Sequence, residues 1–239
     1  MAIMIFSLGL SVKYIQEVFF VWAPANLIYH FSSPEVHFGA EVLNYDTYQE
    51  IIMSRTIEKN HRSFSFDLSY SDTLVFSKAT AKSYLRFIDK NQIEISKFDD
   101  PLISLVAPYS NIEKITETST LNREMYTKLF GVEVPDLTWC FIYEKASLAR
   151  QFGDWQKIAD LHAQAREHVL RPYDHIEWFP FLQAYAYLGM EDEVDQLAPN
   201  INQTPFYRHQ ACQIFSHKGN DQDPAIQAGN QYLAETFCD

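Results

Sequence analysis

The chain has 239 residues, of which 47% are apolar and 15% aromatic, so it can build a packed core and is not a disordered or low-complexity protein. Lys and Arg number 19 against 31 Asp and Glu, and the net charge of −12 argues against a general nucleic-acid binder, because such a surface repels phosphate backbones. The seven glycines form no Gly-rich phosphate-binding loop.

Residues 1–35 are predicted to hold an apolar N-terminal helix and a linker. Residues 1–12 are mostly apolar, a second apolar run follows at 18–22, and Pro24 is expected to end the helix. The first run is shorter than the ~20 residues that cross a bilayer, and it lacks the basic start of a signal peptide. Three interpretations stay open: the end of a membrane helix, a buried helix of a soluble fold, or an atypical signal or interfacial helix. A membrane contact would run through residues 1–22.

Residues 36–131 are predicted to form a small α+β domain that acts as a structural module. Apolar residues at every second position from Phe64 indicate a strand over 64–69. Other short strands are expected at 36–45, 73–76, 84–88 and 93–95. Helices are expected at 48–59 and 121–130, and 102–107 is either a short helix or a buried strand.

Residues 132–239 are predicted to form an α-helical hairpin repeat domain, which completes an α+β fold with two parts. The expected helices lie at 137–152, 155–169, 177–188, 192–197, 206–217 and 225–237. Turn glycines at 153, 189 and 219 bracket the period of about 34 residues that is typical of tetratricopeptide helix pairs. One helix pair cannot cover its own apolar face, so neighbouring pairs must stack.

Single positions support a degenerate tetratricopeptide-like repeat. Ala146 and Ala165 fall where that repeat has small residues, and Trp155, Trp178 and Tyr185 fall on its aromatic positions. The departures are Ile158 and Val194, which replace a small residue, and Pro224 in the poorly matching third unit.

Four stretches together carry a family resemblance. The strongest runs from Trp139 to Trp155 (WCFIYEKASLARQFGDW), and the others are EWFPFLQAYA at 177–186, YLRFID at 84–89 and SNIEKI at 110–115. Over about residues 60–215 the chain resembles the soluble C-terminal tetratricopeptide-like region of large bacterial polytopic membrane proteins of glycosyltransferase-like type. The resemblance implies an outward-facing tail whose transferase chemistry lies in a membrane-embedded part, so no catalytic residue carries over.

Candidate binding residues lie on the first repeat helices. Glu144 and Arg150, with Trp139 and Tyr143 nearby, are a candidate polar patch on a concave face, and Trp178 and Tyr185 are candidate stacking platforms. The competing interpretation places the charges in solvent and the aromatic side chains in the core, as their helical spacing also predicts.

The cysteines and histidines indicate neither a metal nor a cofactor. Asp174, His175 and Glu177 offer only one His, whereas a metal site needs three or four converging ligands. Of the three cysteines, Cys140 and Cys212 are a candidate pair that would link the first and third repeat units in an oxidising compartment.

The sequence therefore predicts a non-enzymatic interaction or substrate-guiding domain, membrane-associated and on the extracytoplasmic face. Its expected partner is a protein or peptide, such as the membrane-embedded glycosyltransferase-like part, and not a nucleic acid. The alternative is a free-standing soluble scaffold, cytoplasmic, that binds a peptide in its concave face. A hydrolase or transferase acting alone lacks a recognisable catalytic set.

Overall fold

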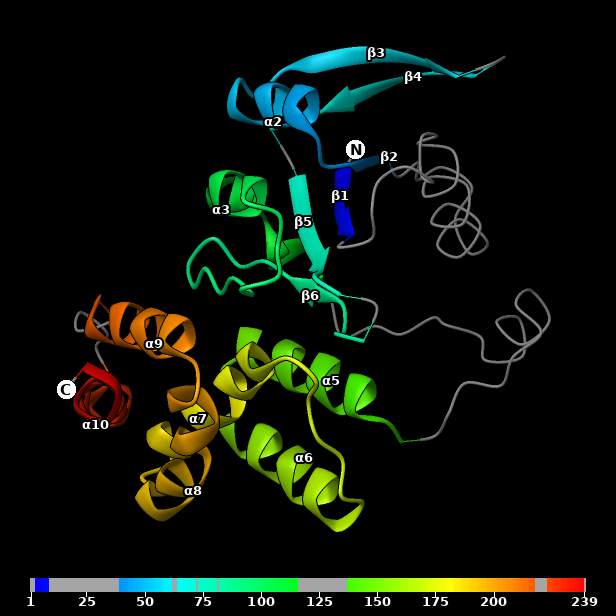
Figure 1. The fold of residues 1–239 in the computed structure, drawn as a ribbon. Helices are drawn as coiled ribbons and strands as arrows, with labels where there is room; N and C mark the ends of the chain where they lie inside the picture. Colours follow the sequence, from blue (N-terminus) through cyan, green and yellow to red (C-terminus); the bar gives the residue numbers. More distant parts are fainter. Residues whose placement is uncertain are drawn as a thin grey trace. The chain divides into compact units, whose positions relative to one another are not determined.

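The computed structural model describes residues 3–8, 39–61, 64–71, 73–80, 82–115, 137–217 and 223–238. The chain divides into two compact units, Met1–Asp136 and Leu137–Asp239, and each is described by itself (Figure 1). The first unit mixes strands with short helices, and the second is helical, which confirms an α+β fold with a helical domain. The predicted domain boundary at 131–132 lies outside the described residues.

A four-stranded sheet organises the first unit. Its strands are β1 (Ile3–Leu8), β2 (Gly39–Val42), β5 (Thr73–Lys78) and β6 (Arg86–Phe87), in the order β2-β1-β5-β6. Strand β1 runs parallel to both of its neighbours, whereas β6 runs antiparallel to β5. The chain therefore places its first described segment at the centre of the sheet.

The prediction of a helix at the N-terminus is wrong for residues 3–8. These residues form β1, which is hydrogen-bonded on both sides. A central strand of a parallel sheet reads as a continuous apolar run, and in a short run this cannot be told from a buried helix. Residues 9–38 lie outside the described residues, and in the described part of the chain no helix is long and apolar enough to cross a bilayer.

A helix and a β-hairpin connect β2 to β5. Helix α2 (Tyr45–Ile52) begins at Asn44, whose Oδ1 accepts a hydrogen bond from Thr47 N at 2.9 Å. The predicted helix over 48–59 ends early because the backbone turns at Ser54 (φ 48°). The hairpin of β3 (Thr56–His61) and β4 (Phe64–Ser69) follows, with Ile57 opposite Leu68.

The remaining elements of this unit are short. Helix α3 (Leu102–Val106) resolves the open alternative at 102–107 in favour of a helix, and the 3₁₀ helices η2 (Ala107–Tyr109) and η3 (Ile112–Lys114) follow. Residues 93–95 form no strand, and the helix predicted at 121–130 lies outside the described residues. The core joins α2, β5 and α3 through the buried side chains of Ile51, Tyr70, Val75, Ile88, Ile103 and Val106.

A buried ion pair closes the loop between β6 and α3. Arg86 on β6 pairs with Asp99, and both side chains are almost fully removed from solvent. Asp99 also accepts hydrogen bonds from Ser77 Oγ and from Ser96 N. Arg86 Nη1 donates to Glu94 O at 3.0 Å, so a single guanidinium holds two points of the loop against the sheet.

The described residues of the second unit form six α-helices and a 3₁₀ helix. They are α5 (Trp139–Gln151), α6 (Trp155–Glu167), η4 (His175–Trp178), α7 (Phe179–Tyr187), α8 (Glu191–Asn202), α9 (Pro205–His217) and α10 (Pro224–Cys238). Thr138 caps α5 and Asp154 caps α6 through hydrogen bonds from Phe141 N and Lys157 N. Gly153 and Gly189 have φ of 70° and 69°, a left-handed conformation that glycine adopts without strain.

Helix α7 is the centre of this unit. All nine of its residues are buried, and it packs against α5, α6, α8 and α10 (Figure 1). A helix that is apolar all round requires neighbours on every side. The arrangement of the other helices therefore follows from covering α7.

Helix α10 approaches α7 closely at Gly229. A Cβ added at Gly229 would lie only 2.8 Å from the carbonyl carbon and oxygen of Ala186. Beside this crossing, Tyr187 on α7 donates a 2.6 Å hydrogen bond from its hydroxyl to Asn230 Oδ1, and Gln183 Nε2 donates to the same hydroxyl at 2.8 Å. Because Gly229 has no side chain, the two helices come close enough for the buried Tyr187 hydroxyl and Asn230 to form a hydrogen bond.

We expect Gly229→Ala to lower the free energy of unfolding by about 2 kcal/mol, because the new methyl group overlaps the α7 backbone. Helix propensity alone predicts the opposite sign, a gain of about 1 kcal/mol. Urea denaturation followed by circular dichroism distinguishes the two. Ala228→Gly, at the exposed neighbouring position, is the control for propensity. A Gly229→Ala protein as stable as the wild type would contradict the close packing.

Candidate functional site

A buried cluster of polar and aromatic side chains joins α5, α6, η4 and α7. We call it the aromatic centre, and its members are Trp139, His162, Glu177, Trp178, Phe181 and Tyr185. Trp139 Nε1 donates to Glu177 Oε2 at 2.8 Å. The Trp139 ring also lies 5.0 Å from the ring of Trp178 and 5.4 Å from that of Phe181, between centroids. One side chain of α5 thus contacts η4 and α7 together.

His162 provides the contact from α6. Its Nδ1 is joined to the Tyr185 hydroxyl by a 2.7 Å hydrogen bond, and its ring packs against Trp178 and Phe181. Burial among these rings, together with the positive charge of Arg166, lowers the pKa of His162 to about 4. Burial likewise raises the pKa of Tyr185 to about 12. Both side chains are therefore uncharged near pH 7, as their apolar surroundings require.

The stretch Asp174–Glu177 is held in place by its two carboxylates. Asp174 accepts a hydrogen bond from the Tyr207 hydroxyl on α9, and Glu177 accepts one from Trp139 on α5. Both side chains are buried, so each hydrogen bond offsets part of the cost of removing a polar group from water. Among the described residues, no three His, Cys, Asp or Glu side chains converge as metal ligands. Chemically, this arrangement fixes η4 between two helices.

The structure separates the six predicted binding residues into two groups. Trp139, Trp178 and Tyr185 lie in the aromatic centre, and Tyr143 is also buried. Their part in packing is observed, whereas contact with a ligand stays a prediction. The two charged residues are nearer to solvent: Glu144 is exposed and Arg150 is half-buried on α5. His162 and Glu177 were not among the predicted site residues, because a lone His or Glu in a helical stretch gives no sign of its partner.

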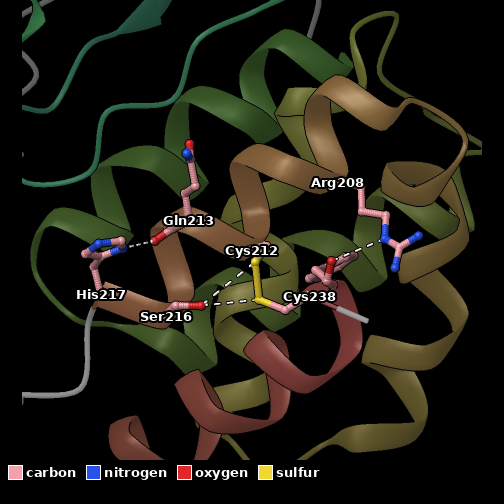
Figure 2. The surroundings of a disulfide bond; sticks show 7 residues. Arg208, Cys212, Gln213, Ser216, His217 and Cys238 are labelled. Atoms are coloured by element: carbon pink, nitrogen blue, oxygen red, sulfur yellow. Dashed lines mark hydrogen bonds between the residues drawn. A yellow bond between two sulfur atoms is a disulfide. The ribbon is translucent and has the colours of Figure 1, made fainter.

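The disulfide is the second feature of this unit. Cys212 on α9 and Cys238 at the end of α10 are bonded, with their Cα atoms 4.9 Å apart (Figure 2). Ser216 Oγ lies 3.2 Å from Cys238 Sγ, and Arg208 Nε donates to the carbonyl of Phe237 at 3.2 Å. These contacts fasten the last turn of α10 to α9.

The candidate pair Cys140–Cys212, which the sequence left open, is therefore not the bridged one. Cys140 lies on α5 and donates a hydrogen bond from its Sγ to Glu144 Oε1 at 3.3 Å. Cys212 pairs instead with the cysteine 26 residues further along, on the next helix. The signal available in the sequence was this short separation, because consecutive helices of a hairpin array are neighbours in space.

Comparisons of the chain with known protein families, with curated proteins and with solved structures found no match. The family resemblance of the sequence accordingly stays a prediction.

The buried His162 predicts that stability depends on pH. The unfolded chain binds a proton at His162 below about pH 6.5, while the folded protein resists it down to about pH 4. The contribution of His162 to the free energy of unfolding is fully present above pH 6.5, and it declines by up to about 3 kcal/mol as the pH falls to 4. His162→Gln should flatten that decline in urea titrations. Exposed His168→Gln is the control, and an unchanged slope in His162→Gln would refute the assignment.

The disulfide predicts a second loss of stability. Cys238→Ser should reduce the free energy of unfolding by about 3.5 kcal/mol. The reason is that the disulfide joins two residues 26 positions apart and so restricts the conformations of the unfolded chain. A reducing agent should produce the same shift in the wild type. Cys140→Ser should leave the urea midpoint unchanged, and an equal effect of both substitutions would contradict the observed pairing.

Proposed function

We propose that this chain is a non-enzymatic interaction or substrate-guiding domain that works on the extracytoplasmic side of a membrane, as the soluble tail of a glycosyltransferase-like membrane protein. The observation that carries the location is the Cys212–Cys238 disulfide. Disulfides persist in oxidising compartments and are rare where glutathione and thioredoxin keep thiols reduced. A chain that relies on this bond is suited to folding outside the cytoplasm.

The roles of the buried polar groups support a non-enzymatic function. His162, Asp174 and Glu177 have the side-chain types that acid–base catalysis uses. Here each is buried, and each hydrogen-bonds to an aromatic side chain of another helix. These bonds hold the helices together, which is the task of a scaffold that presents a surface.

We further infer that α5–α8 are two degenerate tetratricopeptide-like hairpins. Their glycine turns have the same conformation, and Ala146 and Ala165 are fully buried where the repeat has small residues. The rings of Trp155 and Tyr187 meet at 4.7 Å and link the first turn to the end of α7. The third pair departs from this pattern, because α10 packs on α7 and covers it.

The alternative, a cytoplasmic scaffold that holds a peptide in a concave face, makes different predictions. It expects three reduced cysteines, and it needs an open helical face. Helix α7 is buried at every residue, so it provides no such face. This observation favours binding on the outer surface of the unit.

Thiol trapping in the native host tests the proposal. Cells are quenched in acid, and the unfolded chain is then labelled with a maleimide polymer that shifts its mobility on a gel. We expect one labelled thiol, Cys140, before reduction and three after it. Cys140→Ser should show none before reduction. Three labelled thiols without reduction would contradict an oxidising location and would favour the cytoplasmic scaffold.

A further inference from the structure

Two turns of the helical unit are built alike. In the first, Gly153 N donates to Arg150 O and Asp154 N to Ala149 O; in the second, Gly189 N donates to Ala186 O and Met190 N to Tyr185 O. Asp154 and Met190 therefore occupy equivalent positions, each at the N-cap of the following helix. The contact between Trp155 and Tyr187 brings the two turns to the same edge of the unit.

Met190 does not favour the stability of the fold at its position, for two reasons. Its counterpart Asp154 caps α6 with a side-chain hydrogen bond, whereas Met190 has no side-chain cap and leaves α8 without one. It is also 40% exposed, and Phe152 on the neighbouring turn is 55% exposed. Positions that break local rules without a gain in stability are where binding surfaces are expected.

Acidic residues lie close in sequence to these two apolar side chains: Asp154 follows Phe152 by two positions, and Glu191 and Asp192 follow Met190 directly. Asp154, Glu191 and Asp192 are exposed, and none of them forms an ion pair with a described residue. Arg166, in the last turn of α6, forms an ion pair with Glu193 of α8 at 2.7 Å. The acidic residues in the first turn of α8 also stabilise the helix through its dipole, so they have a structural role without any ligand. The exposed apolar side chains have no such role, and they are therefore the stronger sign of a binding surface.

We propose that this turn edge, formed by Phe152, Asp154, Trp155, Met190, Glu191 and Asp192, binds a basic amphipathic helical segment of a partner protein. The apolar face of such a segment covers Phe152 and Met190, and its Lys or Arg residues meet the carboxylate rim. The flexible Met side chain adapts to the shape of an apolar partner. The inference deepens the proposed interaction function and rests on it.

The opposite end of the hairpins offers a matched control. Val169 is 75% exposed and Tyr173 50% exposed, on the loop that follows α6. Val169 has a φ of 55°, a conformation that glycine tolerates better, so Val169→Gly should raise the urea midpoint. Met190→Ser should also raise it by supplying the missing N-cap. Both substitutions remove an exposed apolar side chain and stabilise the fold.

The probe is a synthetic Leu–Lys amphipathic peptide of about 14 residues, long enough to form a helix on binding. Fluorescence anisotropy with the full oxidised chain measures its affinity, and a Leu–Glu peptide of the same pattern tests charge. We expect binding of the Leu–Lys peptide alone, weakened by salt. The double variant Phe152→Ser with Met190→Ser should bind at least tenfold more weakly, and Val169→Gly with Tyr173→Ser should bind like the wild type.

A second pair of variants tests the rim. Glu191→Gln with Asp192→Asn should weaken binding about tenfold, whereas Asp160→Asn with Glu235→Gln removes the same charge elsewhere and should not. Equal losses from both pairs, equal losses from both ends of the hairpins, or no binding of the Leu–Lys peptide would overturn the proposal. Thiol trapping would still test the proposed function separately, because that readout is independent of the edge.

Discussion

Complete burial of α7 is the constraint on which the helical unit depends. A nine-residue helix without a solvent-facing side must be enclosed by other helices, and here α5, α6, α8 and α10 enclose it. The requirement explains why α10 crosses α7 at Gly229, where two backbones approach closely. It also means that α7 itself presents no face to a ligand.

The side chains of α7 carry polar atoms into the core, and the packing of the surrounding helices depends on which groups form hydrogen bonds with these atoms. Tyr185 and Tyr187 each carry a hydroxyl into the core, and His162 and Asn230 meet them from α6 and α10. An unpaired group in such surroundings is expensive, so each bond selects one packing of the helices. Side chains of the types that catalysis uses thereby hold the helices of the unit together.

The disulfide acts at the end of this arrangement. It joins α10 to α9 at the last helical turn, where few buried side chains hold α10, and it reduces the freedom of the unfolded chain. Because such bonds persist in oxidising compartments, the same bond is also the basis of the proposed location. The expected stability and the proposed location thus both rest on one covalent link, whereas the proposed binding edge rests on exposed side chains that the core does not need.

The sequence by itself determined the helical half and the glycine turns at 153 and 189, because helical periodicity and turn chemistry are local. For Trp139 and Trp178 it offered both a core position and a binding position, and the structure places both side chains in the core. It also predicted β4 and β5. Tertiary structure alone decided that residues 3–8 form a strand, since a short apolar run is a helix or a strand according to its neighbours. It likewise decided the partners of His162 and Glu177 and the pairing of Cys212 with Cys238. These are contacts between elements distant in sequence, and local spacing carries no record of which side chains the folded chain brings together.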